Sequence, residues 1–206
     1  MKRKRRFLGY LFCMVLILGC GKPVWAKGIF GVTDLINAPN NRVLSPGGFN
    51  LGAHFNEHSK GKIQIDVGLV TDLELGVALD LTRDYNDLAM RFKYRLIPET
   101  KDTFGFAFGI QDIGKDVFSP YVVMGHVLSP YDLRWSLGLG GGGLGGLFFG
   151  ISKVYNTSQV PRVILIGECD SYGLNLGVKI QMNKGLMLDV GVIDMDNFVI
   201  GFTLTN

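Results

Sequence analysis

Apolar and polar residues alternate with a period of two through most of this sequence. Residues 62–69 read Lys-Ile-Gln-Ile-Asp-Val-Gly-Leu, so a large apolar residue stands at every second position. The same alternation returns at 73–81, 88–96, 104–110 and 173–182. Because successive side chains of a β-strand point to opposite sides of the sheet, this pattern predicts strands with one apolar and one polar face.

The number of such segments and the short connections between them predict the topology. Turn-like residues such as Asn, Asp, Gly and Pro separate the alternating segments, which indicates hairpin after hairpin. An even number of strands also lets the first and the last strand pair and close the sheet. We therefore expect an all-β, antiparallel up-and-down barrel of about twelve strands. The expected strands are 49–56, 61–70, 73–82, 88–97, 103–111, 118–128, 131–140, 145–155, 162–168, 172–182, 185–193 and 197–204.

The composition of the two faces indicates how the barrel is oriented. One face is almost continuously Leu, Ile, Val and Phe, and the other mixes Gly and Ala with charges of both signs. A charge that faced lipid near the membrane midplane would cost about 2–4 kcal/mol, and this pattern avoids that cost. We expect a transmembrane barrel with its apolar face towards lipid and a narrow or plugged lumen. The alternative is a soluble periplasmic barrel that binds an apolar ligand inside.

Charged residues on the polar face are the candidates for lining the lumen. Arg91, Lys93 and Arg95 place three cations at alternate positions of one expected strand. One interpretation is structural pairing with nearby carboxylates, and the other is a path for anions or acidic glycans. The lumen-facing candidates are Asp66, Glu74, Asp80, Arg91, Lys93, Arg95, Arg134 and Lys179.

The first residues have the layout of a secretory signal peptide. A basic stretch at 2–6 precedes an apolar stretch at 7–18, and Val-Trp-Ala at 24–26 offers a cleavage site. We predict a signal peptide over 1–26, a segment 27–48 that leads into the barrel, and the barrel over 49–206. A second reading of the same region is lipidation at Cys20, after Ile-Leu-Gly. In both readings the chain is exported. Together with the expected transmembrane barrel, this predicts a location in the outer membrane of a Gram-negative-type envelope.

The charge of the chain depends on that leader. Residues 1–26 hold six of the 21 Lys and Arg residues and none of the 18 acidic residues. The full sequence has a formal net charge of +3, whereas residues 27–206, with fifteen basic and 18 acidic residues, have a charge of −3. The basic character thus belongs to the predicted targeting segment, and a nucleic-acid partner is not expected.

Motifs for catalysis or cofactor binding are weak in this sequence. The run at 138–146 contains Gly-x-Gly-x-x-Gly, but a strand pattern follows it where a dinucleotide site needs a helix, so we predict a hairpin and no cofactor. The three histidines lack metal-ligand spacing, and no metal site is expected. A barrel-embedded lipid hydrolase would have to combine His126 with Ser129, or His54 with Ser59, and nothing in the spacing favours this. We predict no catalytic residues and a protein that is not an enzyme.

Three blocks resemble the YjbH-like family of outer-membrane proteins. Residues 28–48 are similar to the family's opening segment, with Asp34 and Ala38 in place of its Gly and Thr. Residues 109–123 and 167–177 resemble two further recurring blocks. The resemblance implies an outer-membrane β-barrel and, in some members, a link to exopolysaccharide production or export. The partners that it implies are outer-membrane lipid and either an acidic polysaccharide or export machinery.

Overall fold

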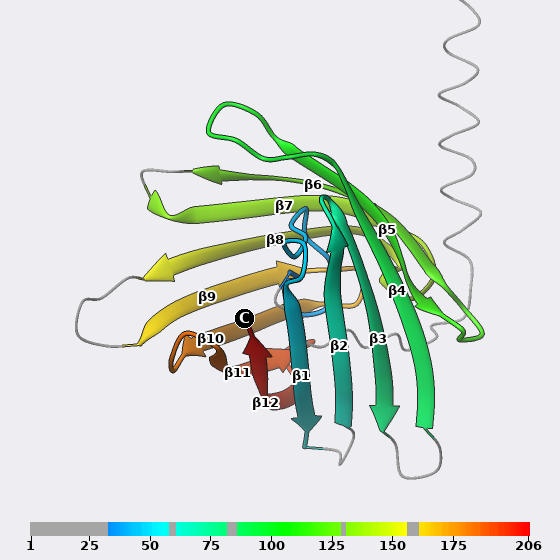
Figure 1. The fold of residues 1–206 in the computed structure, drawn as a ribbon. Helices are drawn as coiled ribbons and strands as arrows, with labels where there is room; N and C mark the ends of the chain where they lie inside the picture. The colour runs from blue at the N-terminus through cyan, green and yellow to red at the C-terminus, as the bar shows by residue number, and fades with distance from the viewer. Residues whose placement is uncertain (1–32, 58–60, 82–85, 129–130, 156–160) are drawn as a thin grey trace, which may run out of the picture.

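The computed structural model describes residues 33–57, 61–81, 86–128, 131–155 and 161–206. The predicted signal peptide (1–26), the start of the segment 27–48 and the lipidation candidate Cys20 lie outside the described residues. Within them the chain is almost entirely β-strand (Figure 1). The elements are β1 (Phe49–Asn56), β2 (Gly61–Val70), β3 (Leu73–Leu81), β4 (Asn86–Ile97), β5 (Gly105–Ile113), β6 (Ser119–Leu128), β7 (Leu133–Gly140), η2 (Gly142–Leu144), β8 (Gly146–Tyr155), β9 (Arg162–Cys169), β10 (Leu174–Gln181), β11 (Leu186–Ile193) and β12 (Asn197–Thr205).

Each strand pairs with its neighbours in the chain, and β1 pairs with β12 to close the barrel. All of these pairings are antiparallel, so the predicted twelve-stranded up-and-down barrel is confirmed. The expected strand limits agree with the observed ones to within about two residues. The glycine run at 138–146 forms the β7–β8 hairpin, as predicted, and positive φ at Gly142 (58°) and Gly145 (69°) shapes it. Closure leaves no sheet edge with unpaired backbone groups.

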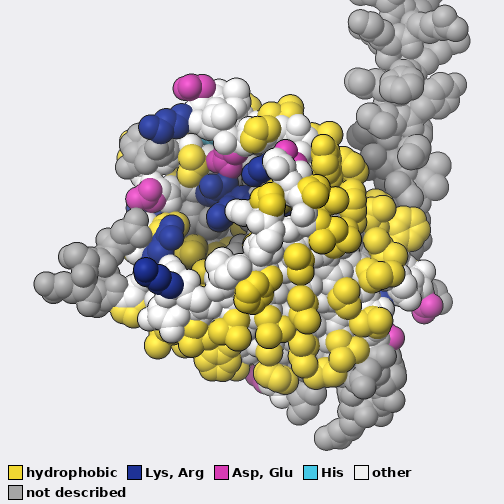
Figure 2. All heavy atoms as spheres, viewed as in Figure 1, with side chains coloured by type: hydrophobic (Ala, Val, Ile, Leu, Met, Phe, Trp, Pro, Cys, Tyr) yellow, Lys and Arg dark blue, Asp and Glu magenta, His cyan; other side chains and the backbone are white. Residues whose placement is uncertain are grey.

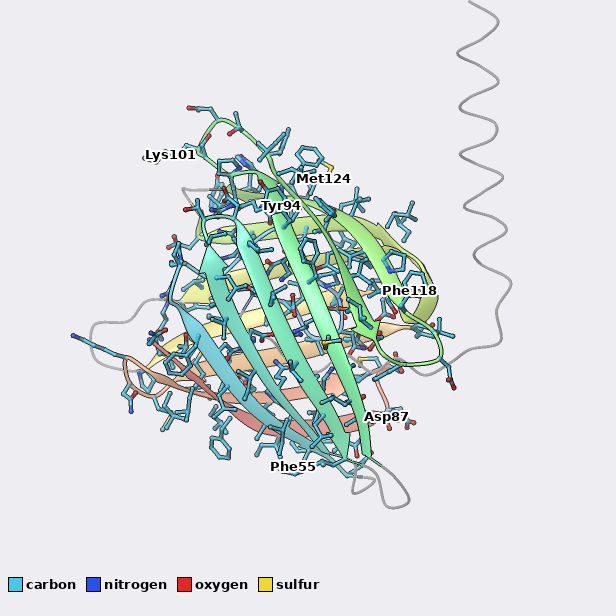
Figure 3. All side chains as sticks on the ribbon, turned by 45° about the vertical axis from the view of Figure 1, so that its right-hand side comes forward. Phe55, Asp87, Tyr94, Lys101, Phe118 and Met124 are labelled. Carbon is cyan, nitrogen blue, oxygen red and sulfur yellow. The ribbon has the colours of Figure 1, made fainter. Side chains whose placement is uncertain are left out.

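The two faces of the barrel differ in the way the alternation indicates. Large apolar side chains such as Ile65, Val77 and Leu176 lie on the outer surface, each between 43% and 50% exposed. Figure 2 shows many yellow, hydrophobic side chains over the outer wall on the face in view, and Figure 3 labels Phe55, Tyr94 and Met124 on the strands of that wall. Polar and small side chains are buried inside. No helix among the described residues has the length and apolarity to cross a bilayer.

Residues 33–48 precede β1; residues 33–41 lie inside the barrel, and residues 42–48 are more exposed and lead to β1 at the rim. Their first part is deeply buried, with Leu35 2%, Ile36 1% and Ala38 0% exposed. These apolar residues pack in one cluster with inward side chains of the strands, including Tyr121 and Phe148. We call residues 33–48 the plug, because their buried part occupies the lumen that a barrel of this size would otherwise leave to water or side chains.

Candidate functional site

The plug folds back on itself inside the lumen. Asp34 forms an antiparallel bridge with Pro39, and the amide of Leu35 donates to the carbonyl of Ala38 at 3.0 Å. Residues 36–38 form the tip of this tight turn. The remaining amides of the tip have no backbone partner in the turn, so side chains of the barrel wall must satisfy them.

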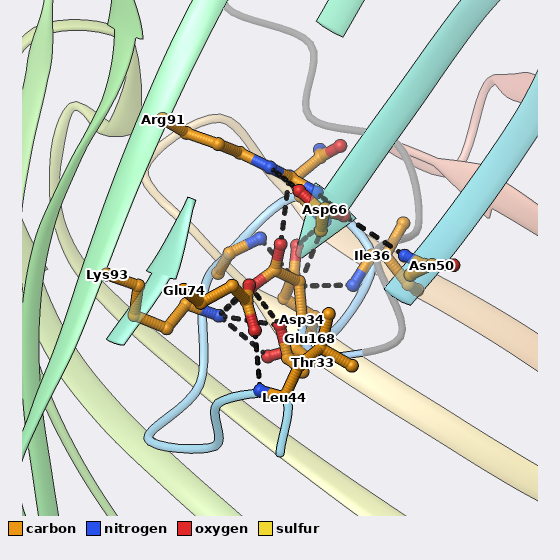
Figure 4. Close-up of polar contacts among 12 residues, drawn as sticks. Thr33, Asp34, Ile36, Leu44, Asn50, Asp66, Glu74, Arg91, Lys93 and Glu168 are labelled. Atoms are coloured by element: carbon orange, nitrogen blue, oxygen red, sulfur yellow. Dashed lines mark hydrogen bonds and ion pairs between the residues drawn. The ribbon is translucent and has the colours of Figure 1, made fainter. Parts of the chain in front are cut away.

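Glu168, near the end of β9, meets that need. Its carboxylate accepts backbone N–H groups from Ile36 (2.9 Å), Asn37 (3.0 Å) and Ala38 (3.0 Å), as Figure 4 shows in part. Asn175 at the start of β10 donates to the same carboxylate at 2.7 Å. Glu168 is 1% exposed, so these four donors take the place of water around its carboxyl group. We call this arrangement of Glu168 and Asn175 around the tip the latch.

A second set of contacts holds the start of the plug by charge. The carboxylate of Asp34 lies 2.6 Å from the ammonium of Lys93 and 3.2 Å from the guanidinium of Arg91 (Figure 4). Asp34 lies outside the strands, and its burial alone would raise its pKa. The charges of Lys93 and then Arg91 outweigh burial and hold that pKa below the ordinary value. Asp34 is therefore ionised and paired at neutral pH.

Glu74, near the start of β3, holds both ends of the plug at once. It accepts the Thr33 hydroxyl at 2.7 Å and the Leu44 amide at 2.9 Å. Lys93 lies 3.7 Å from Glu74 and also donates to the Thr33 carbonyl at 3.0 Å. One carboxylate thus ties together residues eleven positions apart in the plug.

Strand register explains how the interior charges meet. Asp66 on β2 and Arg91 on β4 both stand opposite Gly76 of β3. A Cβ atom at Gly76 would overlap the Asp66 carboxylate and lie 2.6 Å from Arg91 Nε. The missing side chain lets Arg91 reach across β3 and donate from Nε to Asp66 at 2.5 Å.

The same arrangement recurs where β1 pairs with β12 to close the barrel. His54 on β1 and Asp189 on β11 flank Gly201 of β12, and their side chains meet at 2.9 Å across it. Thr203 donates to the same Asp189 carboxylate at 2.6 Å. Interior glycine thus makes room for polar pairs that connect alternate strands.

Interior glycines also make room for the plug itself. A Cβ atom at Gly150 of β8 would overlap Leu35, and one at Gly105 or Gly125 would overlap Asn41. The Gly and Ala content of the polar face is therefore a packing requirement of the occupied lumen. It reflects the plug as well as the convergence of wall side chains.

The eight predicted lumen residues lie in four places. Four of them surround the plug, as described above for Asp66, Glu74, Arg91 and Lys93, and Lys179 is buried opposite Asp189 on β11. Arg95 and Arg134 lie at the rim where β1 begins and β12 ends; Arg95 pairs with Asp72 at 2.5 Å and Arg134 pairs with Glu99. Asp80 lies towards the opposite rim and pairs with Lys115. The two cations beside the plug and the two at the rim are all paired with carboxylates. The side chains of Arg91 and Lys93 are 15% and 5% exposed, whereas those of Arg95 and Arg134 at the rim are 29% and 21% exposed.

Residues that sequence reasoning did not single out complete the site. Asp34, Asn41 and Arg42 belong to the plug, which has no periodic pattern, and Glu168 was noted only within a block that resembles the family. A signal was available, because 34–42 is unusually rich in Asn and Asp for a segment with buried apolar residues. Register decides which wall carboxylate they meet.

The structure bears on the two alternative functions, the soluble ligand-binding barrel and the lipid hydrolase. A soluble barrel with an apolar ligand would turn its large apolar side chains inward, and the structure exposes them instead. For a hydrolase, Ser59 and Ser129 lie outside the described residues. His54 is completely buried against Asp189, and His126 lies 5.0 Å from the ring of Phe104. Within the described residues, no group of three or more His, Cys, Asp or Glu side chains could hold a metal ion.

The closed strands, the apolar exterior and the polar interior define a barrel of the outer-membrane type whose lumen holds a segment of its own chain. Comparison with known proteins agrees with this class. The YjbH family model, described as "Exopolysaccharide biosynthesis protein YbjH", matches residues 26–162, and the chain belongs to this family. No match was found among curated proteins.

Solved structures with a similar fold include a porin and an outer membrane protein. The KdgM porin superposes with a TM-score of 0.57 at 12% identity, over 76% of this chain and 98% of that chain. A KdgM porin in complex with disordered oligogalacturonate gives 0.55 at 14% identity, over 76% and 98%. The outer membrane protein Omp33 of Acinetobacter baumannii gives 0.51 at 9% identity, over 80% and 99%. At such identities the likeness concerns the fold.

The three blocks that carry the family resemblance form the plug and parts of the barrel wall that contact it. Residues 33–48 are the plug, 109–123 include Tyr121 and Val123 of the interior apolar cluster, and 167–177 include the latch residues. The third block lies beyond the residues that the family model matches. The resemblance thus falls on the parts of the chain that fill the lumen and hold the plug there.

Proposed function

We propose that this protein is a non-enzymatic outer-membrane barrel that acts in the production or export of an acidic exopolysaccharide, and that its plug keeps it closed at rest. The observation that carries the proposal is a charged interior, filled by residues 33–48, inside an apolar outer wall. Membership of the YjbH family supports the polysaccharide role. The KdgM complex with oligogalacturonate supports an acidic polysaccharide as the partner, because that porin shares the fold.

Membrane insertion is tested by arginine substitution on the outer wall. Val77 lies mid-strand in β3 and is 43% exposed, whereas Val70 lies at the end of β2 and is 56% exposed. Val77→Arg should destabilise the barrel in detergent or lipid by about 2–4 kcal/mol, and Val70→Arg by about 0–1 kcal/mol. Equal effects of the two substitutions, or recovery of the wild-type protein in the soluble periplasmic fraction, would contradict a transmembrane barrel.

The mature N-terminus follows from the same proposal. We expect signal peptidase to cleave after Ala26, so that the intact mass of the purified protein corresponds to residues 27–206. A mass that corresponds to residues 20–206 plus acyl chains would instead show lipidation at Cys20.

The polysaccharide role is tested in cells that lack the gene. We expect less acidic exopolysaccharide in the medium of the deletion strain and restoration by the wild-type gene. Unchanged release, with production of the polymer verified, would overturn the proposed function.

A further inference from the structure

A hollow opens at the rim of the barrel where β4 and β6 end and β7 begins. It has a volume of about 380 Å³, within the range of about 300–1,000 Å³ common for small-molecule sites. Four cations and one carboxylate line it, together with Asn41, Thr100 and Val127. Figure 2 shows dark-blue Lys and Arg side chains gathered in a hollow of this face. We call Arg42, Arg95, Lys101 and Arg134 the cationic mouth.

Arg42 is the residue of this group with the least compensation. Its side chain is exposed to solvent in the hollow, and among the residues that the structure describes its guanidinium has no hydrogen-bond or ion-pair partner. The protein atoms around it and, next, the charge of Arg134 lower its pKa; the carboxylate of Glu99 acts in the opposite direction, Arg162 adds a further repulsion, and Glu74 adds a smaller attraction. A concave surface with excess charge of one sign concentrates ions of the opposite sign. The position of Arg42 in the plug brings this charge into the hollow.

The hollow already accommodates a carboxylate. Glu99, in the β4–β5 connection, pairs with Arg134 and accepts the side-chain amide of Asn41 at 3.2 Å. Arg95 pairs with Asp72 at the edge of the hollow, where both side chains keep more than a quarter of their exposure. Arg42 and Lys101 therefore remain available, and Arg134 has donors directed at a carboxylate-sized group.

We propose that the cationic mouth binds a carboxylate-bearing sugar residue of an acidic polysaccharide, with Arg42, Lys101 and Arg134 as donors and Glu99 as the internal competitor. This inference rests on the proposed function and names the part of the barrel that meets the polymer. The proposed glycan contact lies at the rim and does not involve Arg91 and Lys93, because both of these are paired with the plug carboxylate of Asp34. The site is polar and lies at the mouth of the lumen, away from the lipid-facing wall.

The test is a binding titration of the full-length mature protein in detergent with oligogalacturonate. The matched ligand is the same oligomer with its carboxylates methyl-esterified, which keeps the size and hydroxyl groups but removes the charge. We expect binding of the acid, weakened by added salt, and no measurable binding of the ester. Equal binding of both ligands would overturn the inference.

Variants locate the site within the rim. Lys101→Ala and Arg42→Ala should each weaken binding by about three- to tenfold, since each removes one charge-assisted contact. Lys184→Ala is the control, because Lys184 is an exposed lysine in the β10–β11 connection at the same rim but outside the hollow. Glu99→Gln should strengthen binding severalfold by removing the competing carboxylate. Equal losses for Lys101→Ala and Lys184→Ala would reduce the effect to general rim charge and contradict a defined site.

The outcome is separable from that of the proposed function. Absence of binding, together with reduced polysaccharide release in the deletion strain, would refute the site and leave the function in place. Specific binding together with unchanged release would refute the function and leave the site.

Discussion

The latch and the cationic mouth are two charged regions that touch the same plug but meet water very differently. Glu168 of the latch is 1% exposed and accepts three consecutive backbone amides, whereas Arg42 of the mouth is exposed and has no partner among the described residues. Loss of a buried acceptor leaves its donors unsatisfied, at about 1–3 kcal/mol each. Loss of an exposed charge alters stability by less than about 0.5 kcal/mol. We therefore expect the latch to hold the plug and the mouth to be available to a ligand.

Glu168→Ala should have the largest effect, because it leaves the amides of Ile36, Asn37 and Ala38 without their acceptor. We expect the plug to be destabilised by about 3 kcal/mol or more. In planar bilayers the variant should conduct ions, whereas the wild-type protein should remain closed. Glu57→Ala, at an exposed glutamate of the β1–β2 turn, is the control and should stay closed. A closed Glu168→Ala barrel would mean that the latch does not hold the plug.

Asp34→Asn should have the next largest effect, about 2 kcal/mol, because it removes the charge from the hydrogen-bonded contacts of the plug with Lys93 and Arg91. The lowered pKa of Asp34 means that its contribution is present above the ordinary aspartate range and is lost as pH falls through the still lower folded pKa. The contribution of this ion pair should therefore be the same at pH 5 as at pH 7, so Asp34→Asn should destabilise the plug equally at both pH values. A clearly smaller effect of Asp34→Asn at pH 5 than at pH 7 would contradict an ionised, paired Asp34.

Gly150→Ala should have an intermediate effect of about 1–3 kcal/mol, because the added Cβ would overlap Leu35, which is 2% exposed and closely packed. Gly167→Ala on the neighbouring strand is the matched control, since its Cβ would lie 3.5 Å or more from other atoms. Protease accessibility of the plug should increase only in the first variant. The same accessibility in both variants would show that strand propensity, rather than contact with the plug, decides the result.

Arg42→Ala should have the smallest effect: its stability should lie within about 0.5 kcal/mol of the wild type. The barrel should therefore stay closed in planar bilayers, and the midpoint temperature of its heat-modifiable migration should barely change. Its effect on ligand binding should be clear, as described above. A conducting Arg42→Ala barrel would break the comparison, because the mouth would then contribute to plug retention as the latch does.

Much of the architecture could be read from side-chain alternation. The period of two at 62–69 and 73–81 predicted both the strands and the side that each residue occupies, because strand geometry is local and repeats along the chain. The Gly-rich run at 138–146 was likewise correctly predicted as a hairpin. Charges such as Asp66 and Arg91 could be placed on the polar face by the same reasoning.

The pairing of those charges could not be read in the same way. Asp66 and Arg91 are 25 residues apart and meet only because both stand opposite Gly76 in the register of three strands. Asp80 could be placed on the polar face, yet the alternation does not identify its partner, which is Lys115 from the β5–β6 connection. Partner choice depends on stagger around the whole barrel, which no local pattern encodes.

The sequence by itself thus determined a twelve-stranded barrel with an apolar outer wall and a polar interior, because side-chain period and turn chemistry act over a few residues. Only the tertiary structure decided that residues 33–48 occupy the lumen and that Glu168 holds their tip. It also decided that Arg42 and Arg134 share a solvent-filled hollow. These contacts join residues up to 132 positions apart, and their geometry exists only once the barrel has closed around the plug.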